Sequence, residues 1–97
     1  MPTHDHWTAI RELIGSHNQR DAKAGVQVHR FLVDVETEHG RLPALVLLRT
    51  AWMALERSLV EAPHANTNEH RAACLAAFDL LQQVAARGGE EANPPLG

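Results

Sequence analysis

Hydrophobic residues recur every three or four positions along most of this chain, in four segments separated by Gly, Pro or polar residues. This spacing is typical of one face of an α-helix. The segments are divided at Gly15 and Ser16, at His39 and Gly40 with Pro43 close behind, at residues 63–67, and at Gly88 and Gly89. The sequence therefore predicts an all-α fold, a small helical bundle of one short and three longer helices.

Each segment has one apolar face, which we expect to form the core of the bundle. The predicted core residues are Trp7, Ile10 and Ile14 in the first segment, with Leu13 beside them; Ala24, Val28, Phe31, Leu32 and Val35 in the second; Leu45, Leu48, Trp52, Leu55 and Leu59 in the third; and Cys74, Phe78, Leu81 and Ala85 in the fourth, flanked by Ala77, Leu80 and Val84. A chain of 97 residues is enough for one such core. We expect residues 1–89 to form a single domain and the polar, proline-containing residues 90–97 to be disordered.

The second segment leaves two interpretations open. Residues 26–37, VQVHRFLVDVET, are rich in β-branched side chains and partly alternate, as a strand would. A strand needs a partner, however, and no other part of the chain has a strand pattern. We favour a helix, which Gly25 destabilises by roughly 1 kcal/mol. The alternative is a strand paired across a dimer.

The third segment is the most apolar, and its hydrophobic residues occupy more than one face. Besides the predicted core stripe, Val46, Met53 and Val60 repeat every seven residues on a second strip. Arg49 and Glu56 lie between the two strips, one heptad apart. A helix that is apolar on so much of its circumference is central in its bundle or shared between two molecules. The second segment has a similar extra apolar line at Val26 and Val33, opposite its core stripe.

These extra apolar surfaces predict a protein–protein interface and a homodimer. If two copies of the third helix cross antiparallel near Trp52 and Met53, Arg49 of each chain lies level with Glu56 of the other. The alternative is that both charges lie at the wet edge of a monomeric bundle. The predicted interface residues are Val26, Val33, Val46, Arg49, Trp52, Met53, Glu56 and Val60.

The overall charge narrows the class of partner. Nine basic and twelve acidic residues give a formal net charge of −3, so no global positive field attracts nucleic acid or anionic lipid. Arg20, Lys23 and Arg30 nevertheless fall on one stripe of the second segment. The alternative function is therefore a nucleic-acid-associated helical subunit that uses this stripe, although a solvated helix face is the favoured interpretation.

The sequence offers little catalytic or metal-binding chemistry. It lacks a Gly-rich phosphate loop, an HExxH pair and a GxSxG elbow. His70 and Cys74 are four residues apart, which is a metal-ligand spacing, and His64 is a conceivable third ligand. Cys74 lies in AACLAAFDLL, however, where a small core residue is the simpler explanation. We expect no enzymatic activity, no cofactor and no metal.

The remaining features concern location and source. No apolar run approaches the roughly 20 residues of a membrane span, the N-terminal residues have no signal-peptide pattern, and the single cysteine fits a reducing compartment. We therefore expect a cytoplasmic protein. Abundant Ala, and Arg in preference to Lys, are typical of a GC-rich bacterial, plasmid or phage genome. The sequence as a whole predicts a small adaptor, regulator or inhibitor that binds another protein.

Overall fold

The computed structural model describes residues 4–16, 22–61 and 67–87. Four α-helices account for nearly all of them: α1 (His4–Ser16), α2 (Ala22–His39), α3 (Pro43–Glu61) and α4 (Thr67–Ala86). The predicted all-α bundle is confirmed. The first helix is the shortest, with 13 residues against 18, 19 and 20 in the others, so the lengths differ less sharply than "one short and three longer" suggests. The expected tail, residues 90–97, lies outside the described part of the chain.

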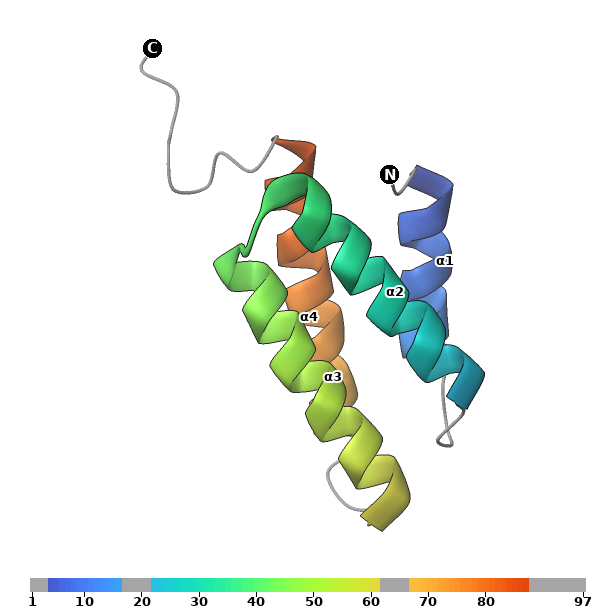
Figure 1. Ribbon diagram of the computed structural model, residues 1–97. Helices are drawn as coiled ribbons and strands as arrows, with labels where there is room; N and C mark the ends of the chain where they lie inside the picture. Colours follow the sequence, from blue (N-terminus) through green and yellow to red (C-terminus); the bar gives the residue numbers. More distant parts are fainter. Residues whose placement is uncertain (1–3, 17–21, 62–66, 88–97) are drawn as a thin grey trace.

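The helices form a bundle in which α3 and α4 pack most extensively on each other. Figure 1 shows α2 and α3 on the near side, α4 behind them and α1 beside α2. All of residues 26–37 lie within α2, so the alternative of a strand is wrong for this segment. A helix needs no second chain to satisfy its backbone groups, and its stripe of apolar residues is covered by the other helices.

A short turn sets the antiparallel pairing of α2 and α3. Gly40 ends α2 with a φ of +83°, and its N–H donates a 2.8 Å hydrogen bond to the carbonyl of Glu36. Glycine adopts this left-handed conformation without a steric penalty. Pro43 begins α3, where its missing N–H costs nothing, and Val46 N–H donates to the Leu42 carbonyl at 3.1 Å. The predicted break at this point is confirmed.

The core contains the apolar faces expected of α1, α2 and α3. The predicted stripes of α2 and α3 are buried throughout, as are Trp7, Ile10 and Ile14 of α1. On α4 the buried face is rotated from the predicted one, because Ala77 and Val84 are buried whereas Leu80 is 40% exposed and Ala85 only half-buried. The core residues outside the predicted set are Leu42, Ala44 and the polar Ser58.

An aromatic cluster joins three of the helices at the centre of the core. The Trp7 ring of α1 meets the Phe31 ring of α2 edge-on at 4.7 Å between centroids, and the Phe78 ring of α4 at 5.4 Å. Phe31 and Phe78 stack at 5.8 Å. Such pairs each contribute about 0.5–1.5 kcal/mol beyond the burial of their area. The cluster therefore holds α1 against the α2–α4 side of the bundle.

Two polar contacts reinforce the attachment of α1 to α4. Arg11 donates two hydrogen bonds to the carboxylate of Asp79, from Nε at 2.8 Å and from Nη2 at 3.1 Å. These bonds lower the pKa of Asp79. Arg71 Nη1 donates a 2.6 Å bond to the carbonyl of Ile14. Since the last four carbonyls of a helix lack intrahelical donors, Arg71 completes the C-terminal end of α1 from a neighbouring helix.

Candidate interaction surface

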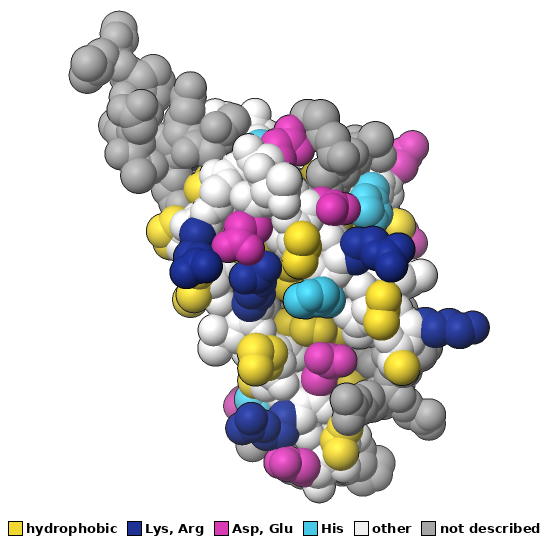
Figure 2. Space-filling view, viewed as in Figure 1, with side chains coloured by type: hydrophobic (Ala, Val, Ile, Leu, Met, Phe, Trp, Pro, Cys, Tyr) yellow, Lys and Arg dark blue, Asp and Glu magenta, His cyan; other side chains and the backbone are white. Residues whose placement is uncertain are grey.

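The outer face of α2 and α3 carries large apolar side chains in contact with solvent. Val26 and Val33 on α2 are 54% and 40% exposed, and Val46, Met53 and Val60 on α3 are 46%, 63% and 52% exposed. All five were predicted to face outward at an interface. Figure 2 shows this face, where hydrophobic side chains lie among charges of both signs and a histidine. Larger apolar patches rimmed by polar residues mark binding surfaces in soluble proteins.

A hollow of about 310 Å³ lies between α2 and α3 on this face. Its lining consists of Gly25, His29, Leu32, Arg49, Trp52, Met53 and Glu56. Leu32 and Trp52 are almost completely buried, at 2% and 4% exposure, so they form the apolar floor. The hollow is thus apolar below and charged at its rim, an arrangement in which the floor supplies burial and the charges supply orientation.

Gly25 brings the carboxylate of Glu56 close to α2. A Cβ atom added at Gly25 would lie 2.9 Å from Glu56 Oε2, so any larger residue would displace that carboxylate. The sequence identified Gly25 only as a weakness in the helix. The close approach of Glu56 to Gly25 occurs because α3 lies alongside α2. The sequence pattern of α2 does not predict this arrangement.

Arg49 has a partner within its own chain. Its Nη2 donates a 3.0 Å bond to Glu36 Oε1 on α2, and Arg41 Nε donates to Glu36 Oε2 at 3.2 Å. Hydrogen bonds from Arg41 and Arg49 lower the pKa of Glu36. The sequence paired Arg49 only with Glu56 across a dimer. The Glu36 contact gives Arg49 an ion-pair partner within a single chain, in a half-buried position.

Trp52 differs in position from the other residues of the predicted interface. Trp52 is part of the core and reaches the hollow only as its floor, because the a/d stripe that contains it is covered by the other helices. The residues missed were Gly25, His29 and Leu32, which line the hollow from α2. Leu47 and Leu80, 57% and 40% exposed, were also not assigned to a surface. The sequence pattern does not distinguish these residues from core residues. The packing of the helices decides which side of each helix is exposed.

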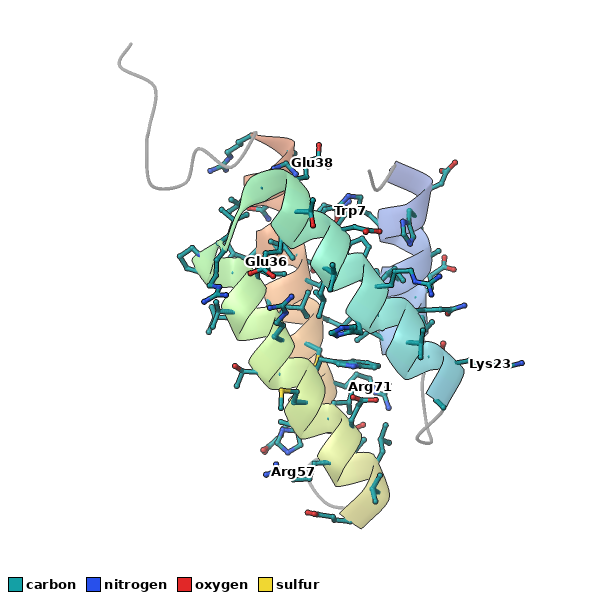
Figure 3. All side chains as sticks on the ribbon, viewed as in Figure 1. Trp7, Lys23, Glu36, Glu38, Arg57 and Arg71 are labelled. Carbon is teal, nitrogen blue, oxygen red and sulfur yellow. The ribbon has the colours of Figure 1, made fainter. Side chains whose placement is uncertain are left out.

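Two of the three basic residues proposed to bind nucleic acid lie within the described part of the chain. Lys23 and Arg30 are exposed on α2, and Figure 3 shows Lys23 directed away from the bundle. Arg20 lies outside the described residues. The sequence has two Trp, two Phe and no Tyr, and all four of these aromatic side chains are buried. None of them is therefore placed to stack on a base.

The candidate metal ligands do not converge in the described structure. Cys74 is fully buried on α4, His70 is half-buried near the start of the same helix, and His64 lies outside the described residues. Within residues 4–16, 22–61 and 67–87, no three His, Cys, Asp or Glu side chains form a group that could hold a metal ion. Burial raises the pKa of the Cys74 thiol to about 12, despite the opposing charge of Arg71. A thiol in this state is a packing group, because the thiolate is the reactive form.

The buried thiol predicts that the protein loses stability in alkaline solution. The folded thiol keeps its proton up to a pH of about 12, whereas an unfolded one ionises from about 9. The free energy of unfolding is therefore unaffected by ionisation of this thiol below a pH of about 9. Above that pH it falls by up to about 1.4 kcal/mol per pH unit, because only the unfolded thiol loses its proton. Urea unfolding between pH of about 8 and about 10 measures this slope. A Cys74→Ala variant should have a shallower slope, and an equal slope in both proteins would contradict the assignment.

Among the residues described, no helix is long and apolar enough to cross a membrane. Comparisons of the chain with models of protein families, with curated proteins and with solved structures found no match.

Proposed function

We propose that this protein is a small, non-enzymatic helical module that acts by binding another protein through the α2–α3 face, as an adaptor, regulator or inhibitor. The observation that carries the proposal is the exposure of Val26, Val33, Val46, Met53 and Val60 on the outer sides of α2 and α3, together with a hollow between these helices that Met53 lines. Burying such side chains against a partner stabilises the complex by roughly 25 cal/mol per Å² of apolar area removed from water.

The chemistry of the rest of the chain supports a binding role. We assign no catalytic role to Cys74, because its thiol is buried and has a pKa of about 12. A single free thiol also fits the reducing cytoplasm, where we place the protein. The mixture of apolar residues with Arg49, Glu36 and Glu56 on one face is the composition of an interface with a charged rim.

Site-specific photo-cross-linking in living cells tests the proposal. A photoreactive amino acid at Met53 should form covalent adducts with a protein, because this side chain is the most exposed of the apolar residues on the face. The matched control is the same amino acid at Ala72, an exposed position on α4. A Val33→Asp change on the neighbouring helix should lower the Met53 adduct by about tenfold, the effect of placing a charge within a buried contact. Equal labelling at both positions, or none at Met53, would overturn the proposal.

A further inference from the structure

The two ends of the α2–α3 hollow carry opposite charge. Arg49 lies at one end, where its guanidinium group and that of the neighbouring Arg41 share the single carboxylate of Glu36, so these three groups carry a net charge of +1. At the other end Glu56 lies against Gly25. No ion pair of Glu56 occurs within the described residues, and Arg57, the adjacent cation on α3, points away from α2 (Figure 3).

This separation of charge is self-complementary. Arg49 and Glu56 are seven residues apart on α3, or roughly 10.5 Å along the helix axis. A two-fold axis that lies in the plane of the interface, crosses the middle of the hollow and runs perpendicular to α3 exchanges its ends, so the +1 end of each chain meets the Glu56 end of the other. The same rotation turns the α2–α3 face of each chain, with its exposed Val26, Val33 and Met53, toward the same face of the other.

Arg49 retains the donors that such a contact requires. A guanidinium group has five N–H donors, and the bond to Glu36 uses one of them, from Nη2. The side chain remains 32% exposed. Arg49 can therefore hold Glu36 in its own chain and a second carboxylate at the same time, and its intrachain pair fixes the orientation in which it meets that carboxylate.

We propose that the partner bound by the α2–α3 face is a second copy of this chain, in an antiparallel two-fold arrangement that places Arg49 of each protomer against Glu56 of the other. This proposal rests on the proposed function and names its partner. Each chain supplies the charge that the other lacks, twice, as an isologous interface requires. The pairs fix the register and orientation of the two apolar faces, at some cost in desolvation.

A mixing experiment with two charge-reversed variants tests the arrangement. Glu56→Arg alone places cations opposite cations, and Arg49→Glu alone places carboxylates opposite carboxylates. Each variant should therefore dissociate at concentrations where the wild type is a dimer, with a Kd raised at least about tenfold. An equimolar mixture should dimerise again, because every Arg then faces a Glu of the other variant. Sedimentation velocity measures all three states.

Controls separate this proposal from changes in folding and from the broader function. Glu12→Arg makes the same change of charge on α1 and should leave the dimer intact. Circular dichroism checks the helices of each variant, and Glu56→Arg keeps the Arg49–Glu36 pair. A monomeric wild type, or variants that stay dimeric, or a mixture that stays monomeric, overturns the two-fold arrangement. If the wild type is monomeric while Met53 cross-links to a different protein, only this inference fails; without such adducts, the proposed function fails too.

Discussion

Replacing Phe31 with alanine is expected to lower the free energy of unfolding by about 3–5 kcal/mol. The side chain is fully buried, and its ring contacts the rings of His6, Trp7 and Phe78 from two other helices. The substitution removes the apolar area of a phenylalanine and leaves a cavity that α1 and α4 cannot both close. Since a domain of this size has a total stability of about 5–15 kcal/mol, a large fraction of the margin would be lost.

Urea unfolding followed by far-UV circular dichroism measures this effect. The control is Gln27→Ala, an exposed substitution on the same helix, which should change stability by no more than about 0.5 kcal/mol. The melting temperature of the Phe31→Ala protein should fall by more than about 12 °C. A loss below about 1.5 kcal/mol would contradict the central position of Phe31 in the core.

Arg71→Met is expected to cost about 1.5–3 kcal/mol, with its largest effect on α1. The guanidinium of Arg71 donates a 2.6 Å bond to the carbonyl of Ile14, from a half-buried position. Hydrogen bonds to charged groups contribute more than neutral ones, and methionine keeps much of the side-chain volume while removing the donor. The last turn of α1 then retains the local bond from Ser16 Oγ to the Glu12 carbonyl but loses its hydrogen bond from α4.

Hydrogen exchange of the backbone amides distinguishes this local effect from global destabilisation. Amides of α1 should exchange at least about tenfold faster in Arg71→Met, while those in the centre of α3 and α4 should change less. Arg57→Met, the same substitution at an exposed position on α3, should leave α1 unchanged. Uniform acceleration over all helices in Arg71→Met would show that the contact supports the whole bundle and does not act mainly on α1.

Much of the fold follows from local pattern. The stripe Ala24, Val28, Phe31, Leu32 and Val35 is buried as predicted, because a 3.6-residue period places these side chains on one side whatever covers them. The turn at Gly40 and Pro43 was also predictable, since each residue has a backbone preference that suits its position. The strand alternative for residues 26–37 arose because β-branched residues suit both structures, and burial in the bundle decides between them.

The tertiary structure decided which surfaces and charges meet. Periodicity predicted that Val46, Met53 and Val60 form a strip apart from the core, and the structure leaves that strip exposed. The periodicity of α3 did not predict a partner for Arg49 on another helix of the same chain. Its bond to Glu36 depends on the antiparallel placement of α2 against α3.

The contacts of Gly25 with Glu56 and of Arg71 with Ile14 have the same origin. The sequence by itself determined the four helices and most of their apolar faces, because these depend on residues three or four apart in the chain. The hollow, its charged ends and the attachment of α1 depend on distances between helices, which the packing of large side chains such as Trp52 and Phe31 sets and no local pattern records.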